Sequence, residues 1–413
     1  YDIIVYGTDW EVAAEMNEHH ETMFLDNYEN VLWYCYDNYP AVNVWKLDNA
    51  IANADFNGNG IEVIPGTYWL LGGDDGYGGS NNSWYINWAG TASHSDYHDE
   101  PWTYGYIWNN AYENLISSPD NDFSQLGWYT LMINLHETGW HDGGEISGWE
   151  HRYSSHMKNA NVYAEVSRWL NGDYENTTDA FFSDIDRDGV DEVVMHNDKA
   201  YFVFESIGGR AVWVYAKDDF GNAYSLVGSD VAYYPETDGD YNESSNNHVA
   251  ALSDVSPNYQ HDFYDVEIVQ SEEDLVKVKF SKDNLEKECR LETGNAYLSV
   301  DYDYDGSVFI KSGWTPDLLD IIWNGKANIQ RMWGENASYC GRRNKNHGGT
   351  VSYVLGNGGA LHNGTFEGTI VMGDEIYGEN SFTFFLYAGY TDEPYDEYEN
   401  HVNSLPNCDY KEY

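Results

Sequence analysis

The sequence predicts an α/β segment at the amino terminus, a helical segment in the middle and an all-β, sandwich-like part behind them. Three observations lead to this fold class. The chain opens with an unbroken apolar run, which a turn and a helix signature follow at once. A stretch with apolar residues at helical spacing comes next, and after residue 174 apolar residues recur at every second position between glycine-rich turns. We therefore expect domains at 1–115, 116–174 and 175–413.

The first predicted domain, residues 1–115, begins with a buried strand. Residues 3–6 (IIVY) form an apolar run of the kind that parallel sheets bury on both faces. Gly7 permits a turn, and Thr8 with Glu11 has the spacing of a capping box for a helix that begins at once. Residues 29–39 and 44–54 are predicted helices. The long aromatic stretch 68–90 is predicted to be a functional loop, because its many rings are not typical of a disordered linker.

The second predicted domain, residues 116–174, is helical. Ser147 and Glu150 form another capping box, and Met157 and Ala164 fall on one face of the helix that it starts. Gly172 is expected to end this helix, since glycine readily takes the left-handed conformation that follows a last turn.

The third predicted domain, residues 175–413, consists of strands. The segment 199–218 reads as two strands around Gly208 and Gly209, and the same period of two continues in 266–281, 296–314, 349–356 and 381–390. Short strands joined by glycine-rich turns over more than 200 residues are typical of a sandwich. One helix is expected to interrupt them at Thr315 and Pro316.

The charge balance excludes several classes of partner. Twenty basic and 70 acidic side chains give a formal net charge of −50, which repels polyanions such as nucleic acid and anionic membrane. Two interpretations of the acidity stay open: a heavily solvated surface suited to high salt, or a requirement for cations. No apolar run approaches the ~18 residues that a membrane-spanning helix needs, so we expect no membrane insertion.

Cysteine usage and sequons favour an exported protein. The four cysteines are far apart and lack the paired spacing of zinc ligands, while one or two disulfides would suit an exported chain: Cys35, Cys289, Cys340 and Cys408. Five glycosylation sequons agree with export, although an asparagine-rich chain produces several by chance: Asn81, Asn176, Asn242, Asn336 and Asn363. Because the chain starts at Tyr1 without a leader, we expect a processed or partial chain. The expected location is extracellular or at the cell surface.

Asp9 is the first candidate catalytic residue. It stands at the carboxyl end of the predicted buried strand, where reactive groups of barrel enzymes collect around a common pocket. The alternative is structural, because an acid in the first turn of a helix interacts favourably with the helix dipole.

A second candidate site lies at residues 136–150, which are rich in histidine, tryptophan and acids. The two histidines are five residues apart, whereas the zinc-protease helix needs four, so metal binding is not expected here. Indole rings, imidazoles and carboxylates suit a sugar site, and an aromatic cluster between a loop and a helix is the alternative. The candidate residues are His136, Glu137, Trp140, His141, Asp142, Trp149 and Glu150.

A third candidate site is the acidic loop 184–192 (DIDRDGVDE). Acids at alternate positions around a tight turn suit calcium, which takes six to eight oxygen ligands. The candidate ligands are Asp184, Asp186 and Asp188, with Asp191 or Glu192 closing the ring. In so acidic a chain an accidental run of acids is the alternative. Residues 55–62 form a weaker copy, and Asp301, Asp303 and Asp305 instead read as a strand with one wet acidic face.

Several long segments resemble glycoside hydrolase family 57, in particular its amylopullulanase-like members. They follow one another in the family's order over most of the chain: 5–17 (VYGTDWEVAAEMN), 65–80 (PGTYWLLGGDDGYGGS), 134–170 (NLHETGWHDGGEISGWEHRYSSHMKNANVYAEVSRWL), 184–218 (DIDRDGVDEVVMHNDKAYFVFESIGGRAVWVYAKD) and 312–334 (SGWTPDLLDIIWNGKANIQRMWG). Long collinear segments are more specific than a short motif.

The resemblance implies a retaining α-glucan hydrolase. The implied fold is an incomplete β/α barrel of seven strands, a helical domain and a β-rich domain. Asp9 matches the family's general acid/base, with Trp10 beside it, and residues 136–150 match a conserved region that lines the sugar site. The expected substrate is an α-glucan with α-1,4 links, and α-1,6 links are a further candidate. Independently of the resemblance, the acids of the loop 184–192 make calcium an expected cofactor.

One departure from the family pattern concerns the nucleophile. Retaining hydrolysis needs a second carboxylate ~5 to 5.5 Å from the acid, which in this family is a glutamate on an earlier barrel strand. The present sequence starts at the acid/base strand. We therefore expect the amino-terminal half of the same protein as a partner, beside the glucan. The alternative function is a noncatalytic carbohydrate-binding or surface-assembly protein, such as a layer or filament subunit, derived from such a hydrolase.

Overall fold

The computed structural model divides the chain into two compact units, residues 1–66 and 67–413, which we describe separately. The described residues are 30, 33–39, 104–133, 141–142, 145–146, 148–187, 189–228, 250–260, 262–314, 329–333, 339–356, 358–367 and 372–390. In the first unit they form a short helical segment, 33–37, and a turn follows in which the backbone N–H of Asn38 donates to the carbonyl of Tyr34 at 3.1 Å. This segment lies within the helix predicted for residues 29–39.

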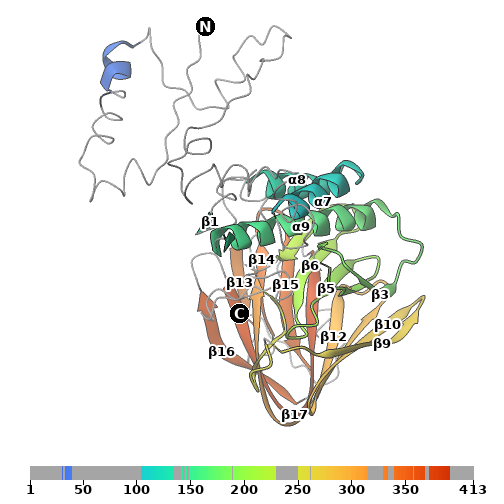
Figure 1. Cartoon of the computed structure of the whole chain (residues 1–413). Coiled ribbons are helices and arrows are strands. Elements are labelled where there is room, and N and C mark those ends of the chain that lie inside the picture. The colour runs from blue at the N-terminus through green and yellow to red at the C-terminus, as the bar shows by residue number, and fades with distance from the viewer. Residues whose placement is uncertain are drawn as a thin grey trace. The chain divides into compact units, whose positions relative to one another are not determined.

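Three helices form a layer in the second unit (Figure 1): α7 (Tyr104–Ile116), α8 (Asp122–Ile133) and α9 (Gly148–Asn171). Asn121 caps α8, since its Oδ1 accepts hydrogen bonds from the N–H groups of Phe123 and Ser124 at 3.1 and 3.3 Å. The helix α9 starts directly after Ser147 and ends before Gly172, which has a φ of +83°, so its predicted limits are confirmed. None of the described helices is long and apolar enough to cross a bilayer.

A five-stranded antiparallel sheet lies against these helices, with the strand order β3-β4-β5-β6-β7. Its strands are β3 (Asp179–Ser183), β4 (Glu192–His196), β5 (Ala200–Phe204), β6 (Ala211–Lys217) and β7 (Ala223–Val227). Every residue of β4 and β5 is buried, which agrees with the apolar runs 193–195 (VVM) and 200–204 (AYFVF). Between β5 and β6 the predicted glycine turn is confirmed: a Cβ on Gly208 would lie 2.5 Å from the carbonyl oxygen of Gln260.

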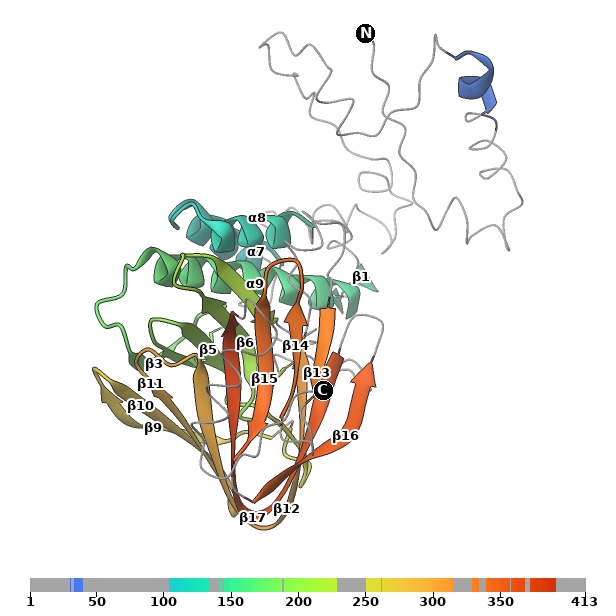
Figure 2. The ribbon, with the colours of Figure 1, turned by 180° about the vertical axis from the view of Figure 1, so that it is seen from behind.

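A second, ten-stranded antiparallel sheet follows. Its main order is β13-β14-β15-β17-β12-β11-β10-β9, with β16 beside β17 and β8 beside β12. The strands are β8 (Ser253–Ser256), β9 (Asp265–Glu272), β10 (Leu275–Lys282), β11 (Leu285–Glu292), β12 (Tyr297–Trp314), β13 (Ile329–Trp333), β14 (Tyr339–Asn344), β15 (Gly349–Leu355), β16 (Gly359–Glu367) and β17 (Met372–Tyr390). The two long strands β12 and β17 run side by side through the sheet (Figure 2), and their register shifts between Asp303 and Ser307.

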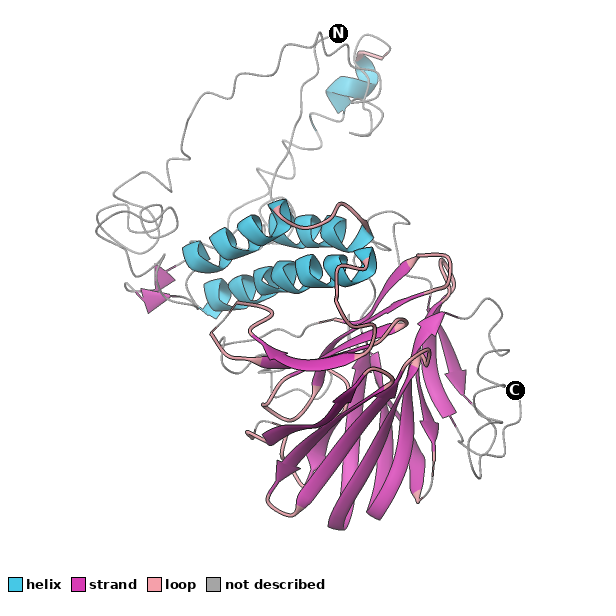
Figure 3. Ribbon diagram, turned by 90° about the vertical axis from the view of Figure 1, so that its right-hand side faces the viewer, coloured by secondary structure: helices cyan, strands magenta, loops and turns pink. Residues whose placement is uncertain are grey.

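The second unit thus has three layers, helices, five-stranded sheet and ten-stranded sheet (Figure 3). One core lies between the sheets and contains, for example, Phe204 and Phe280, whose ring centroids are 5.1 Å apart. The other lies between the helices and the five-stranded sheet, and includes Trp169 and Tyr201 with centroids 5.5 Å apart. The five-stranded sheet is therefore buried on both faces, whereas the ten-stranded sheet leaves one face to solvent along β9 to β12.

The β-rich part of the predicted fold is confirmed, and the barrel segment lies almost entirely outside the described residues. The helical layer begins at Tyr104, earlier than the expected boundary at residue 116. Thr315 and Pro316 also lie outside the described residues. Asp301 and Asp303 are exposed on β12, as expected for a strand with one solvent-facing, acidic side. Cys289 is a buried free thiol, and burial raises its pKa to about 12.

Candidate functional site

The predicted catalytic and sugar-binding residues lie mostly outside the described part of the chain. This holds for Asp9, Trp10, His136, Glu137 and Trp140. His141 belongs to the short strand β1 (His141–Asp142), which pairs with β2 (Glu145–Ile146) just before α9. Trp149 and Glu150 lie in the first turn of α9, and only the backbone of these three residues is described.

The acidic loop between β3 and β4 brings three of its predicted ligands together. Carboxylate oxygens of Asp184, Asp186 and Glu192 lie within 4.8 Å of one another. The side chains of Asp186 and Glu192 are 1% and 0% exposed. Asp191 is exposed and does not belong to this group, and Asp188 lies outside the described residues. Glu192, rather than Asp191, therefore closes the cluster.

The backbone of the loop holds these carboxylates in place. The N–H of Ile185 donates to Glu192 Oε2 at 2.8 Å, and the N–H of Gly189 donates to Asp184 Oδ2 at 3.2 Å. The fully buried Asn161 of α9 donates from its amide to the carbonyl of Asp186 at 2.9 Å. The loop is thereby attached to the helical layer as well as to the sheet.

This cluster has the chemistry of a hard-cation site. Calcium binds oxygen ligands at about 2.3–2.6 Å, so two ligands of one ion are at most about 5 Å apart. The observed limit of 4.8 Å meets that condition. Carboxylates this close also repel one another, and burial strengthens that repulsion because the interior screens charge weakly. A divalent cation between Asp184, Asp186 and Glu192 would remove the repulsion.

A buried ion pair lies between the two sheets. Lys287 of β11 and Asp254 of β8 are both 0% exposed, and their Nζ and Oδ2 atoms are 3.1 Å apart. The hydroxyls of Tyr264 and Tyr302 donate to the two carboxylate oxygens, each at 2.7 Å. Burial, followed by the charge of Asp254, raises the pKa of both tyrosines. Lys287 occupies a core-facing position of β11, so this network binds β8 to the sheet.

A buried histidine lies beneath the helical layer. His196, at the end of β4, is 1% exposed and packs edge-on against Tyr174, with ring centroids 4.7 Å apart. The ring of Tyr201 stacks on that of His196, with centroids 5.8 Å apart. Burial lowers the pKa of His196 to about 4, against the smaller opposing effect of Asp179. The imidazole is therefore neutral near pH 7.

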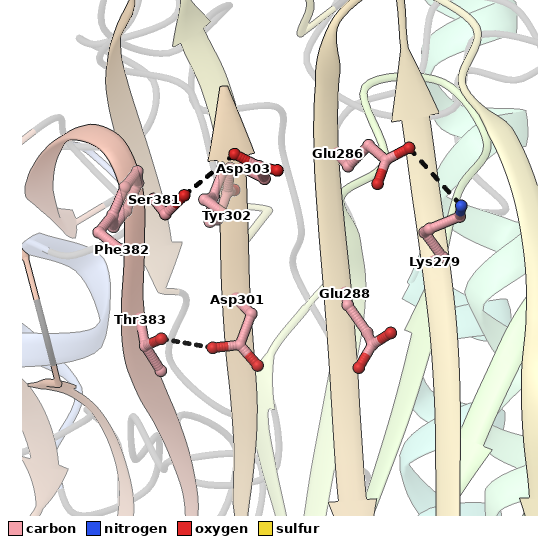
Figure 4. A pocket seen from close by; sticks show the side chains of 9 residues that line it. All are labelled: Lys279, Glu286, Glu288, Asp301, Tyr302, Asp303, Ser381, Phe382 and Thr383. Atoms are coloured by element: carbon pink, nitrogen blue, oxygen red, sulfur yellow. Dashed lines mark hydrogen bonds and ion pairs between the residues drawn. The ribbon is translucent and has the colours of Figure 1, made fainter. Parts of the chain in front are cut away.

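A polar groove of about 440 Å³ lies on the solvent-facing side of the ten-stranded sheet (Figure 4). Four acids from two neighbouring strands line it: Glu286 and Glu288 of β11, and Asp301 and Asp303 of β12. Ser381 and Thr383 of β17 lie at one edge of the groove, next to the two aspartates, and Lys279 of β10 lies at the other edge, next to Glu286. Tyr302 and Phe382 alternate with these residues along β12 and β17. Their rings are buried in the core and stacked 4.8 Å apart.

Neither this groove nor the buried ion pair was predicted from the sequence. The alternation within residues 285–292 (LEKECRLE) indicates two faces, and Lys287 stands on the face of Leu285 and Cys289. A charged residue on an otherwise apolar face was the available signal for a buried pair. The groove had no local signal, because its walls come from strands that are about 80 residues apart: Asp301 pairs with Thr383.

Comparisons with other proteins give weak structural similarities only. No family model matches the chain, and no curated protein matches it. The chain is similar to 4-alpha-glucanotransferase from Thermococcus litoralis (TM-score 0.33, 11% identity, 72% of this chain and 51% of that one). It is also similar to YidC from Thermotoga maritima (0.32, 13%, 56% and 58%) and to a mutant of heparan sulfate lyase HepC from Pedobacter heparinus (0.33, 9%, 69% and 56%).

In each of these three comparisons the match spans less than two thirds of the other chain. A glycoside hydrolase of family 81 from Clostridium thermocellum is also among the similar structures, at a TM-score of 0.23. Enzymes that act on carbohydrates thus recur among weakly similar structures, and TM-scores this low carry no argument about function. The weakly similar structures therefore include YidC as well as carbohydrate-active enzymes.

Proposed function

We propose that this chain is part of a retaining glycoside hydrolase of family 57 that acts on α-glucans. The observation that carries the proposal is the run of collinear segments, 5–17 to 312–334, that resembles the amylopullulanase-like members. The order of the elements is compatible with it, because the resemblance implies a helical domain followed by a β-rich domain. In the described residues, α7 to α9 precede two antiparallel sheets.

The proposed mechanism gives Asp9 the role of general acid/base. Its carboxyl group would protonate the leaving glycosidic oxygen and then activate water, so it has to be protonated near the working pH. A second carboxylate would attack the sugar ring from ~5 to 5.5 Å away. We assign that carboxylate to the amino-terminal half of the same protein, as the resemblance suggests. Trp10 and the residues of 136–150 would hold the sugar.

Replacement of Asp9 by asparagine in the complete protein tests this proposal. Asparagine keeps the size and hydrogen-bonding capacity of the side chain and removes its titratable proton. Turnover of maltooligosaccharides should disappear while glucan binding, measured by calorimetry, remains. Asp2→Asn, at the other end of the predicted strand, is the matched control and should retain activity. Near-normal turnover by the Asp9 variant would remove Asp9 from the mechanism.

The alternative is a noncatalytic, extracellular carbohydrate-binding or surface-assembly protein. The net charge of −50, the 37 tyrosines and the sequons favour it, because they suit a chain exposed outside the cell. The same activity assay separates the two functions. Glucan binding by the complete protein without any turnover would favour the alternative. Both functions predict export, which cell fractionation and a search for glycans on Asn176 would check.

We propose that Asp184, Asp186 and Glu192 bind a calcium ion, with Asp188 as a further ligand of the ion. An ion that binds only the folded state stabilises it in proportion to the logarithm of its concentration. Calcium should therefore raise the Tm of the wild-type protein, and a chelator should reverse the effect. Asp184→Asn should abolish this calcium dependence, whereas Asp191→Asn should preserve it. An identical calcium response in the wild type and the Asp184 variant would contradict the proposal.

A further inference from the structure

We propose that the chain forms a two-fold dimer, in which a basic turn of each copy docks against an acidic tip of the other. The basic turn, residues 343–347, joins β14 to β15, and the acidic tip, residues 272–274, joins β9 to β10. Two turns of opposite charge at one end of the ten-stranded sheet carry this inference. It does not depend on the proposed hydrolysis.

The basic turn belongs to a long stretch of the chain that lacks acids. Residues 336–366, which include β14, β15 and most of β16, contain neither aspartate nor glutamate, although 70 of the 413 residues are acidic. Their basic side chains are Arg342, Arg343 and Lys345, so the stretch has a formal charge of +3 and the rest of the chain carries −53. This part of the sheet is therefore positive in a protein that is otherwise strongly negative.

Lys345 presents an unneutralised charge on this turn. It is exposed, and it forms no ion pair with any residue that the structure describes. In a chain with so many acids this is unusual, because four partly exposed lysines of the described residues each pair with a carboxylate: Lys199, Lys277, Lys279 and Lys282. A carboxylate of another molecule can pair with Lys345 without displacing an existing partner.

Hydrogen bonds and a ring stack fix the shape of the basic turn. The N–H of Gly348 donates to the carbonyl of Asn344 at 2.7 Å, and the N–H of Asn346 donates to Asn344 Oδ1 at 3.1 Å. The ring of His347 stacks on that of Tyr224 of β7, with centroids 5.0 Å apart. A turn held in this way loses little backbone entropy when it binds a partner.

The acidic tip has the complementary charge. Glu272, Glu273 and Asp274 are consecutive and exposed, and none of them forms an ion pair with a residue that the structure describes. The tip is also held in place: Thr293 donates its hydroxyl to the carbonyl of Glu273 and its N–H to the carbonyl of Asp274, each at 3.1 Å. It therefore offers three carboxylates on a fixed backbone.

The strand register places both turns at the same end of the sheet. Gly349 of β15 pairs with Tyr390 at the end of β17, Leu275 of β10 pairs with Glu292 at the end of β11, and β12 begins beside both of these ends. In the strand order β13-β14-β15-β17-β12-β11-β10-β9, the hairpins lie near opposite edges (Figure 2). Five strand spacings separate them, which is about 24 Å along the sheet.

This separation prevents the two turns of one copy from neutralising each other. It is about three times the Debye length of ~8 Å at physiological ionic strength, so their mutual attraction is screened. A two-fold rotation about an axis between them brings each basic turn against the acidic tip of the other copy, and gives two equivalent contacts. The net charge of −50 repels the copies at a distance, but screening limits that repulsion while charges in contact still attract.

Charge reversal in the complete protein tests the dimer. Lys345→Glu places like charges at both contacts of a homodimer, and so does Glu273→Lys. In a mixed dimer of the two variants, however, both contacts again join opposite charges. Lys282→Glu is the matched control, because it makes the same change of charge at the opposite end of β10. The dimer Kd is measured by sedimentation velocity at 0.15 M and 1 M NaCl.

The wild type should dimerise at 0.15 M NaCl and dissociate at 1 M, where the Debye length is ~3 Å. Each single variant should raise the dimer Kd at least about hundredfold, and an equal mixture of the two should restore it. The control should match the wild type.

Three results would overturn the inference: a wild type that stays monomeric, wild-type affinity in either single variant, or no recovery in the mixture. A monomeric wild type that binds heparin through Lys345 would assign the basic turn to a polyanion instead.

Discussion

Acidification below about pH 6.5 should destabilise the protein through His196. The imidazole is buried and its pKa is about 4 in the folded state, against about 6.5 in an unfolded chain. Between these two values the unfolded state binds the proton and the folded state does not. Stability is therefore fully present above about pH 6.5 and is lost as the pH falls toward 4.

The magnitude follows from the two pKa values. Integration of the proton linkage gives a loss of about 2 kcal/mol at pH 5 and about 3 kcal/mol at pH 4, relative to pH 8. Asp179 affects a lower range: burial alone would raise its pKa, but hydrogen bonds from Ser271, Asn176 and the Ala180 N–H lower it below 3.8. The contribution of Asp179 to stability is lost only at lower pH, so its pH range is separate from the range in which His196 acts.

The assay compares the wild type with His196→Gln, which cannot titrate. Urea unfolding at pH 8, 6 and 5 should show a wild-type free energy that falls by about 2 kcal/mol more than that of the variant. The variant's absolute stability is irrelevant, because only the difference in pH dependence is compared. A histidine NMR titration should also contain one resonance with a pKa near 4 that the variant lacks. Equal pH dependence of the two proteins, or a pKa above 6 for His196, would refute the reasoning.

Three further predictions concern stability and use urea unfolding as the measurement. Lys287→Met should lower the free energy of unfolding by about 3–5 kcal/mol, because Asp254 stays buried without its cation. Adding Asp254→Leu should recover part of this loss. A loss under about 1 kcal/mol would contradict the contribution of the buried ion pair. Asn197→Ala should cost about 3 kcal/mol, because the fully buried Asn197 donates to the carbonyls of Glu292 and Asn295 and accepts from two backbone N–H groups. Gly341→Ala should lower the free energy of unfolding by about 1–3 kcal/mol, because the added Cβ would lie 2.2 Å from the Cβ of Ser352. An unchanged free energy would show that β14 and β15 can move apart to admit a methyl group.

Local patterns in the sequence predicted the local elements of the fold. The capping residues of α9 gave its start, and Gly208 and Gly209 gave the turn between β5 and β6. The alternation of Asp301 and Asp303 with buried neighbours gave the exposed face of β12. These features depend on contacts between residues that are close in the chain, so they can be recognised without a partner strand.

The arrangement of the layers could not be predicted in the same way. The apolar runs of β4 and β5 agree with a strand buried on both faces, but they do not say that α9 covers one of those faces. A period of two assigns each residue to a side and leaves the partner strand undetermined. The pairing of β12 with β17, which builds the groove, depends on long-range register and on the shift between Asp303 and Ser307.

The candidate metal cluster could be predicted from the sequence in part. The spacing of Asp184 and Asp186 was sufficient to predict a loop that gathers oxygens, whereas the choice between Asp191 and Glu192 was open. Glu192 begins β4, and its side chain is buried, while Asp191 is exposed before the strand. The direction of a side chain at a strand end depends on the sheet that the strand joins, so the loop sequence alone left both residues as candidates.

The most direct measurement for the proposed function is the anomeric form of the first product. The complete protein is incubated with maltoheptaose, and the reducing-end protons of the product are followed by NMR before mutarotation. A retaining enzyme with Asp9 as its acid/base releases the α-anomer first, and Asp9→Asn releases no product. Initial release of the β-anomer, or the same rate of α-anomer release from the Asp9 variant, would contradict the assignment.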